Sequence, residues 1–228
     1  MTSSGEQSGA NGAAWEQVLA SLCRLQSLLP QAVLVGETAA ALYTGHLFSF
    51  DHDHVLPDLR ERFDTVLAQL EAVAGWETAR VQRPILILES LDRVQTGVRQ
   101  LRRSRPLETT VMRVGQHDVT LPTLPEVLRI KAFLCLELNA TRDYLDLAAL
   151  ASHMVIEAAS EALWSMDELY PQKNGDLWAV RTQLAMQLAS RRRTTCKVMT
   201  LANTKAFARP LTIGVMLRRC AENYPTGF

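Results

Sequence analysis

The sequence lacks long apolar runs, clustered cysteines and any net charge. No window of eighteen or more apolar residues occurs in the 228 residues, whereas a bilayer-spanning helix needs about 20. The four cysteines are far apart and show no Cys-x-x-Cys spacing, so a zinc site or a disulfide framework has little support. We expect buried free thiols in a reducing cytoplasm. With 24 basic and 24 acidic residues, the formal net charge of zero first argues against a nucleic-acid partner.

A secretory signal is not expected, because the first twelve residues contain neither a basic segment nor an apolar one. Residues 1–12 are instead predicted to form a disordered lead-in. Hydrophobic residues make up 47% of the chain and charged residues 21%, which is ordinary for a globular protein. We therefore expect a cytoplasmic protein with a real core and no membrane segment.

Hydrophobic periodicity predicts an α+β arrangement followed by helices. The predicted helices before residue 152 are 13–29, 38–43, 58–74, 123–138 and 141–151. The predicted strands are 32–35, 48–56, 77–81, 85–88, 94–101, 109–114 and 118–121. Residues 13–150 are thus predicted to form an α+β domain, and residues 151–228 a helical C-terminal domain.

The most informative stretch carries Asp51 and Asp53 on one predicted strand. Residues two apart on a strand point to the same face, with Cα atoms about 6.6 Å apart. Two such carboxylates can converge on one or two hard cations, as in two-metal phosphoryl-transfer sites, and Mg²⁺ prefers one or two carboxylates plus phosphate oxygens and water. Because Asp is disfavoured in strands, the pair indicates a metal site; the alternative is two solvent-facing aspartates on an edge strand.

The histidines of the same stretch offer a different reading. His52 and His54 alternate with the aspartates and so point to the opposite face. One hypothesis is a zinc or manganese site built from this pair plus His46. The alternative is that the two imidazoles stack and form hydrogen bonds inside the fold.

Upstream, a short predicted strand leads through Gly36 into a helix that begins near Thr38. Backbone N–H groups at a helix N-terminus suit a phosphate group. The strand before Gly36 is expected to lie beside the one that carries Asp51 and Asp53, which would bring a phosphate site and a cation site together.

Three motifs taken in order resemble the AbiEii/MenA-type nucleotidyltransferases, a group within the DNA-polymerase-β-like nucleotidyltransferase superfamily. The first runs through Gly36-Glu37-Thr38, Gly45-His46 and Ser49-Phe50-Asp51-His52-Asp53-His54. The later ones are Arg129-Ile130-Lys131-Ala132 and Arg142-Asp143-Tyr144-Leu145-Asp146-Leu147. The resemblance covers roughly residues 30 to 152.

This resemblance implies a small mixed β-sheet with packed helices and a helical C-terminal part. It also implies Mg²⁺-dependent transfer of a nucleoside monophosphate from an NTP. In toxin–antitoxin members the acceptor is typically RNA, notably the tRNA 3′ end, and an antitoxin protein is then a further partner.

The resemblance also assigns roles to single residues. Asp51 and Asp53 would hold Mg²⁺ against the triphosphate, where charge builds as pyrophosphate leaves. Thr38, Ser49 and the amides after Gly36 would contact phosphate oxygens. Lys131 would supply a point charge to the triphosphate; its alternative is a solvated surface lysine.

The last motif contributes Arg142, Asp143 and Asp146. Asp143 and Asp146 are three residues apart, hence neighbours on one helix face. Asp146 is expected to point into the site and to have a catalytic role. Asp143 is expected either to bind nucleotide beside it or to cap the helix near Thr141. Arg142 is expected to pair with a carboxylate or with a phosphate. The alternative for all three is a structural salt-bridge cluster.

Three positions depart from the pattern of that family. Glu37 stands where Gly or Ser is usual, and Leu47 where an Arg is common. The predicted strand that should carry a third carboxylate offers Gln100, with Asp92 and Glu108 as substitutes. These departures keep open a catalytically degenerate binding module, and a small-molecule, antibiotic-type nucleotidyltransferase is a further alternative.

The charges that cancel overall are unevenly distributed. Residues 1–150 carry 14 Lys+Arg and 18 Asp+Glu, whereas residues 151–228 carry 10 and 6. The candidate RNA-binding residues of this basic tail are Arg191, Arg192, Arg193 and Lys197, and a second basic cluster comprises Arg99, Arg102, Arg103 and Arg105. Such patches can follow a phosphate backbone; the alternatives are a solvated face or a docking surface for an acidic antitoxin.

Overall fold

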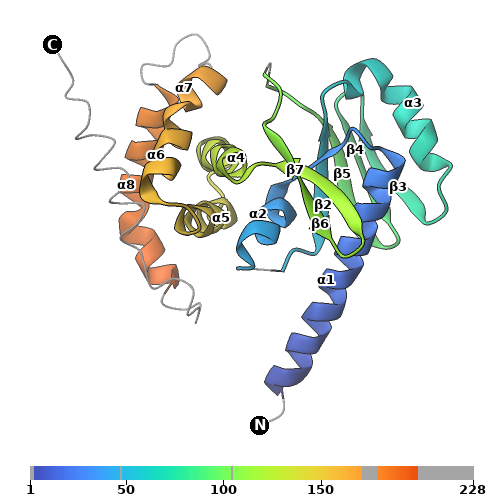
Figure 1. Ribbon diagram of the computed structural model, residues 1–228, viewed down its shortest axis with the longest axis horizontal. Helices are drawn as coiled ribbons and strands as arrows, with labels where there is room; N and C mark the ends of the chain where they lie inside the picture. The colour runs from blue at the N-terminus through green and yellow to red at the C-terminus, as the bar shows by residue number, and fades with distance from the viewer. Residues whose placement is uncertain (1–2, 47, 104, 171–178, 200–228) are drawn as a thin grey trace. The chain divides into compact units, whose positions relative to one another are not determined.

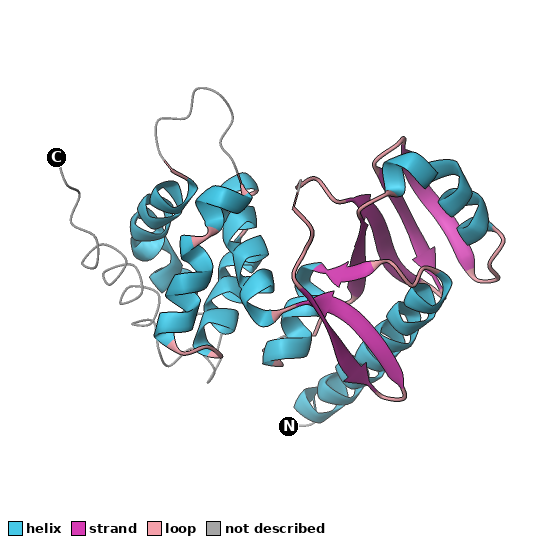
Figure 2. Cartoon of the chain, turned by 45° about the horizontal axis from the view of Figure 1, so that its top comes forward, coloured by secondary structure: helices cyan, strands magenta, loops and turns pink. Residues whose placement is uncertain are grey.

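The computed structural model describes residues 3–46, 48–103, 105–170 and 179–199, with side chains described for residues 11–190 of these ranges. The chain divides into two compact units, residues 1–123 and 124–228. The first unit contains α1 (Ser3–Leu28), β1 (Val33–Val35), α2 (Gly36–Thr44), β2 (Asp51–Leu56), α3 (Leu59–Glu71), β3 (Trp76–Gln82), β4 (Leu86–Leu91), β5 (Val94–Gln100), β6 (Thr109–Val114) and β7 (His117–Pro122). The described part of the second unit is helical, as Figures 1 and 2 show.

Five strands of the first unit form a mixed sheet in the order β1-β2-β5-β4-β3. β2 runs parallel to β5, and the other neighbours are antiparallel. The register sets Asp53 opposite Val35 on one side and Gly97 on the other. The α+β class and the mixed sheet expected from the sequence are confirmed.

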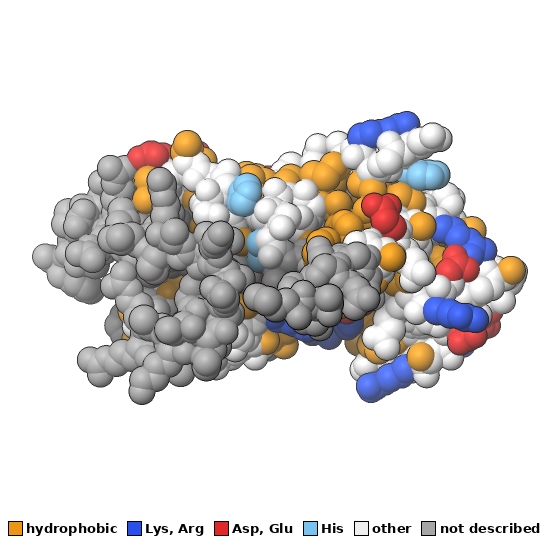
Figure 3. Space-filling model, turned by 90° about the horizontal axis from the view of Figure 1, so that it is seen from below, with side chains coloured by type: hydrophobic (Ala, Val, Ile, Leu, Met, Phe, Trp, Pro, Cys, Tyr) orange, Lys and Arg blue, Asp and Glu red, His pale blue; other side chains and the backbone are white. Residues whose placement is uncertain are grey.

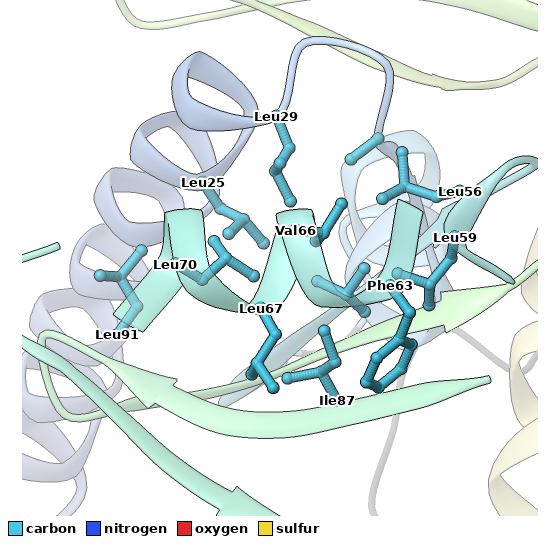
Figure 4. Packing of buried hydrophobic residues seen from close by; sticks show 12 residues of the cluster. Leu25, Leu29, Leu56, Leu59, Phe63, Val66, Leu67, Leu70, Ile87 and Leu91 are labelled. Atoms are coloured by element: carbon cyan, nitrogen blue, oxygen red, sulfur yellow. The ribbon is translucent and has the colours of Figure 1, made fainter. Parts of the chain in front are cut away.

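The two faces of β2 differ because its residues alternate between buried and half-buried positions. His52, His54 and Leu56 face the core, while Asp51 and Asp53 lie on the half-exposed face. The core face is covered by α1 and α3, whose apolar side chains meet those of β4 and β5 (Figure 4). The cluster comprises Leu25, Leu29, Ala32, Leu56, Leu59, Phe63, Val66, Leu67, Leu70, Ile87, Leu91 and Val98.

β6 and β7 form a separate antiparallel ribbon that packs against β1 and α1. Gln26 of α1 acts like a strand residue, because its side-chain amide donates to the Thr120 carbonyl (2.7 Å) and accepts from the Thr120 N–H (2.8 Å). Tyr43 of α2 donates to the carbonyl of Pro122 (2.7 Å). These side chains satisfy backbone groups at the ribbon edge that would otherwise lack partners.

The second unit contains α4 (Leu124–Glu137), α5 (Thr141–Ser152), α6 (Ile156–Trp164), α7 (Met166–Leu169) and α8 (Val180–Met199). α4 contacts α5, α6 and α8. Phe133 of α4 stacks on Tyr170 with ring centroids 4.1 Å apart. Gln187 of α8 donates to the Cys135 carbonyl of α4 (2.6 Å) and to the Tyr144 hydroxyl of α5 (2.7 Å), so one amide joins three helices.

The structure places the boundary between units after Thr123, whereas the sequence predicted it after residue 150. The reason is that α4 and α5 pack with the helices that follow them. α1 begins at Ser3, within the residues 1–12 that were predicted to form a disordered lead-in. Leu47, one of the family departures, lies outside the described residues.

None of the described helices is both long and apolar enough to span a bilayer. Cys23 and Cys135 are buried free thiols, as expected, and burial raises the pKa of Cys23. The side chains of the other two cysteines lie outside the described residues.

Candidate functional site

Asp51 and Asp53 project from the same half-exposed face of β2, as the two-residue spacing predicts. Asp51 is held from two sides. Ser49 Oγ donates to Asp51 Oδ1 (3.0 Å), and Thr38 Oγ1 donates to the Asp51 backbone carbonyl (2.5 Å). These bonds fix both the backbone and the carboxylate of Asp51, so its orientation is set before any ligand binds.

The hydroxyls of Thr38 and Ser49 are therefore already engaged. Their residues are only 1% and 2% exposed, respectively. The sequence predicted that both would contact phosphate oxygens. In the structure both support Asp51, and a phosphate contact by either stays a prediction.

Gly36, the first residue of α2, lies directly against Asp53. Its φ of +80° is readily adopted only by glycine, and a Cβ atom there would lie 3.6 Å from both Cβ and Oδ2 of Asp53. The β1–β2 pairing brings Gly36 to the aspartates, as expected from the sequence. Val35 provides no side-chain cap for the first amides of α2, and Glu37 in the first turn is half-buried.

β5 presents Gln95, Gly97 and Arg99 on the face that carries the aspartates. A Cβ atom at position 97 would lie 2.5 Å from Asp53 Oδ1, so Gly97 leaves the space that this carboxylate occupies. Arg99 Nε lies 3.5 Å from the same oxygen. β5 thus supplies a cation beside Asp53 and no third carboxylate.

The positions considered for a third carboxylate are used elsewhere. The Gln100 amide accepts from the backbone N–H of Arg60 and donates to the Pro57 carbonyl. Asp92, in the turn between β4 and β5, pairs with Arg24 of α1. Glu108 precedes β6, outside the five-stranded sheet.

The histidines lie behind β2, where His52 forms hydrogen bonds in the core. His52 Nε2 is 2.9 Å from Ser21 Oγ, and its Nδ1 is 2.9 Å from Thr96 Oγ1. The rings of His52 and His54 meet edge to face, with centroids 5.2 Å apart. This arrangement matches the alternative of imidazoles packed inside the fold.

Burial lowers the pKa of His52 to about 4. Burial, with the nearby His52, lowers the pKa of His54 well below its ordinary value. Both imidazoles are therefore neutral at neutral pH. His46 lies near the Thr44 hydroxyl instead (2.5 Å), and no three His, Cys, Asp or Glu side chains of the described chain lie close enough together to hold a metal ion.

Glu89 of β4 is a buried acid that the sequence prediction missed. Its pairing with Thr96 places it on the core face of the sheet, and it is only 3% exposed. Burial, reinforced by the charge of Asp53 and opposed by Arg99, raises the pKa of Glu89 to about 9. A lone acid within the apolar strand Leu86–Leu91 was the signal in the sequence.

The remaining predicted site residues lie in the second unit. Lys131 of α4 binds Asp143 Oδ1 (3.0 Å) and Asp146 Oδ2 (2.6 Å) of α5, and all three side chains are at most 3% exposed. Burial alone would lower the pKa of Lys131, but the two carboxylates outweigh it and raise the pKa. Lys131 is therefore no solvated surface lysine, and Asp143 does not cap α5. Arg142 is exposed.

The predicted site residues thus fall into two groups. Gly36, Thr38, Ser49, Asp51 and Asp53 come together in the first unit, and Lys131, Asp143 and Asp146 in the second. The side chains of the candidate RNA-binding residues Arg191, Arg192, Arg193 and Lys197 of α8 lie outside the described residues. On the face of the first unit seen in Figure 3, acidic and basic side chains are interspersed.

The face of β2 that carries Asp51 and Asp53, called the aspartate face below, offers donors of the kind that Mg²⁺ takes. Two oxygen donors on one half-exposed strand face match the one or two carboxylates that this ion takes, with water and phosphate oxygens completing its shell. The orientation of Asp51 by two hydroxyls is the support that such ligands need.

Comparison with solved structures shows the fold of this chain. An antigenic nucleotidyltransferase-like protein from Paracoccidioides brasiliensis has a TM-score of 0.51 and 17% identity, covering 82% of this chain and 92% of that one. The antibiotic-resistance factor ANT(2'')-Ia gives a TM-score of 0.49 and 11% identity over 67% of this chain. The first of these likenesses shows that the chain has a nucleotidyltransferase-like fold.

Sequence comparisons do not assign a family. No protein-family model matches the chain. A 90-residue stretch, 39% of this chain, is 39% identical to the probable transport protein MmpL11 of Mycobacterium bovis and to the heme uptake protein MmpL11 of Mycobacterium tuberculosis. The match spans only about 9% of the length of those relatives, so their activity is not transferred to this chain.

Proposed function

We propose that this protein is a nucleotidyltransferase that transfers a nucleoside monophosphate from an NTP and uses one divalent cation, Mg²⁺, held by Asp51 and Asp53. The observation that carries the proposal is the pair of carboxylates on one half-exposed face of β2, with Asp51 oriented by Thr38 and Ser49. The nucleotidyltransferase-like fold supports the same reading.

Each residue of the aspartate face has a distinct role in this proposal. Asp51 and Asp53 bind the cation, which when bound neutralises charge on the triphosphate and on departing pyrophosphate. Gly36 lets the start of α2 approach Asp53 closely, so that the first amides of α2 face phosphate oxygens. Thr38 and Ser49 hold Asp51 in place.

Lys131, Arg142, Asp143 and Asp146 belong to the proposal through their resemblance to the later motifs of AbiEii/MenA-type enzymes. The structure supplies a buried Lys131–Asp143–Asp146 ion cluster. Lys131 and Asp146 are proposed as catalytic, with Lys131 also contacting nucleotide phosphate. Since both are buried and paired, this role requires Lys131 to exchange a carboxylate for a phosphate oxygen.

The proposed acceptor is RNA, with the tRNA 3′ end as its specific form and an antitoxin as a further partner. Its support is the basic composition of residues 177–221, which hold nine Lys or Arg and no acid. A toxin-like role rests on the family resemblance alone. An antibiotic-type enzyme that modifies a small molecule is distinguished by activity in the absence of RNA.

A second candidate function is nucleotide binding without transfer. The observation that favours it is the side of β5 facing Asp53, which carries Gly97 and Arg99 and no acid. A site with two carboxylates, one of them paired to an arginine, attracts metal ions less strongly than a site with three unpaired carboxylates does.

Labelling experiments separate these functions. The protein is incubated with Mg²⁺, each α-labelled NTP, and either total RNA or no RNA. Asp51→Asn and Asp53→Asn should each reduce labelling at least about 100-fold, because the cation loses a charged ligand. Asp118→Asn, which changes an exposed, ion-paired aspartate of β7, is the matched control and should label normally.

The pattern of labelling decides among the candidates. Labelled RNA supports the proposal, and label transferred without RNA indicates a small-molecule acceptor. NTP binding with no labelled product favours the non-catalytic module. Transfer retained by folded Asp51→Asn and Asp53→Asn variants would contradict the assigned site.

A further inference from the structure

Arg99 of β5 lies beside Asp53, on the face of the sheet that carries the two aspartates. β2 and β5 are parallel, and their register sets Gly97 beside Asp53 with Arg99 two residues further on the same face. Arg99 Nε is 3.5 Å from Asp53 Oδ1, and the Arg99 side chain is 46% exposed. The guanidinium is thus anchored at a site carboxylate while remaining open to solvent.

The charges on this face limit how many cations it can hold. Asp51 and Asp53 together carry two negative charges, and Arg99 returns one positive charge to the group. No third carboxylate lies with them on β5, and no metal-binding trio occurs elsewhere in the described part of the chain. A second divalent cation would add two more positive charges and would find no third carboxylate on β5.

The missing side chain at position 97 gives Asp53 room to lean toward β5. A Cβ atom there would lie 2.5 Å from Asp53 Oδ1 and 3.1 Å from Leu88 Cδ2. Gly97 therefore allows the contact between Asp53 and Arg99, and it also leaves no side chain between the guanidinium and the aspartate face.

We propose that Arg99 is a nucleotide-binding residue that replaces a second metal ion: it pairs with Asp53 in the free protein and moves to a triphosphate oxygen when NTP and one divalent cation bind. This inference rests on the proposed function and deepens it. A guanidinium binds phosphate through two parallel N–H bonds and is always charged. Exchange of Asp53 for phosphate frees Asp53 to bind the cation, so nucleotide and cation bind cooperatively.

The exchange predicts opposite effects of one substitution on two ligands. Arg99→Gln removes the competitor for Asp53, so Mn²⁺ alone should bind several-fold more tightly. The same variant should bind NTP in EDTA about tenfold more weakly, because a charged phosphate contact is lost. Arg99→Lys keeps the positive charge but cannot donate two parallel N–H bonds to phosphate. Its affinity for NTP should therefore lie between those of Arg99→Gln and the unaltered protein.

The experiment measures Mn²⁺ binding by electron paramagnetic resonance and NTP binding by calorimetry, using the full chain and each of the four NTPs. Arg113→Gln is the matched control, since Arg113 forms an exposed ion pair with Asp118 on the β6–β7 ribbon. The proposal expects one Mn²⁺ per chain with NTP present, and unchanged binding in Arg113→Gln. Unaltered thermal midpoints verify that the exposed substitutions leave the fold intact.

Each outcome bears on a different claim. Two Mn²⁺ ions per chain, or an Arg99→Gln variant that binds NTP and Mn²⁺ as the unaltered protein does, overturns the inference while the proposed function stands. Absence of both Mn²⁺ and NTP binding in the unaltered protein overturns the proposed function and this inference with it. Opposite shifts for the two ligands support both.

Discussion

At the scale of single residues, two carboxyl groups on opposite faces of one sheet have contrasting environments. Asp53 faces the half-exposed side beside Arg99, whereas Glu89 faces the core. Burial, with the charge of Asp53, raises the pKa of Glu89 to about 9. Glu89 is therefore neutral at physiological pH, which avoids the cost of a buried unpaired charge.

These buried groups predict a stability maximum near pH 6.5. The pKa of Glu89 is higher in the folded state, about 9 against an ordinary 4.5, so its contribution falls as pH rises between these values. The pKa of His52 is lower in the folded state, about 4 against 6.5, so its contribution rises with pH over that range, and His54 acts in the same direction. Below pH 6.5 the two histidines change the unfolding free energy more than the one glutamate does, and from pH 6.5 to about 9 Glu89 lowers it.

Urea unfolding at a series of pH values checks this prediction. Above pH 6.5 the unfolding free energy should fall by at most about 1.4 kcal/mol per pH unit. Glu89→Gln should remove this alkaline decline while keeping the acid side, and Glu77→Gln on exposed β3 is the control that should change neither. A Glu89→Gln profile that still declines above pH 6.5 would show that other groups cause the loss.

At the scale of elements, the sequence predicted the strands and helices of the first 152 residues, but of the strand pairs it predicted only that β1 lies beside β2. Alternation within 48–56 and 109–114 is local, so both strands were recognisable. The parallel pairing of β2 with β5 joins residues far apart in the chain, and no local pattern encodes its register. The sequence placed Gln100 at the position of the family's third carboxylate, whereas the register puts Gln95, Gly97 and Arg99 on the face that carries the aspartates.

For the candidate site too, the sequence predicted the local arrangement but not the contacts between elements. Asp51, Asp53 and Ser49 lie within one short stretch, and a two-residue period sufficed to place both carboxylates on one face. The support of Asp51 by Thr38 and the pairing of Arg99 with Asp53 cross between elements, so they required the tertiary structure. A salt-bridge cluster was expected only as an alternative for Arg142, Asp143 and Asp146, and the pairing of the last two with Lys131 was not predicted.

The Lys131 cluster joins α4 to α5, and its disruption is predicted to destabilise the second unit. Lys131→Met removes the buried cation that Asp143 and Asp146 share, which should cost about 3–5 kcal/mol of unfolding free energy. Replacing all three, as Lys131→Met with Asp143→Asn and Asp146→Leu, should recover most of that loss. Chemical denaturation followed by circular dichroism measures both.

The outcome also tests the catalytic assignment of Lys131. A Lys131→Met variant of unchanged stability that no longer transfers nucleotide would show that the lysine acts on substrate and does not serve as a cross-link. Large destabilisation with recovery in the triple variant would identify a structural cluster.

At the scale of the whole molecule, the net charge of zero is the sum of an acidic N-terminal part and a basic C-terminal part. The first 150 residues have four more acidic than basic residues, and the remaining 78 have four more basic than acidic ones. Neutrality therefore does not exclude a nucleic-acid partner, because phosphate contacts depend on local charge.

The basic tail predicts a salt-dependent affinity for RNA. If Arg191, Arg192 and Arg193 contact phosphates, replacing all three with Ser should lower the slope of log affinity against log salt by about 2, since each contact to a single strand contributes about 0.7. Filter binding of tRNA at a series of salt concentrations measures the slope. Arg60→Ser, an exposed arginine of α3, is the control, and an equal slope in the triple variant would remove these arginines from the interface.

The parallel pairing of β2 with β5 also has a consequence for how the protein is made. β3 and β4 lie between these strands in the chain, so on a ribosome β2 emerges well before its central partner. Until β5 arrives, the aspartate strand has only β1 as a neighbour, and Arg99 and Thr96 are not yet there to hold it. Closing such a long loop is slow compared with forming a hairpin. The strand face that carries Asp51 and Asp53 is therefore among the last parts of the five-stranded sheet to assemble.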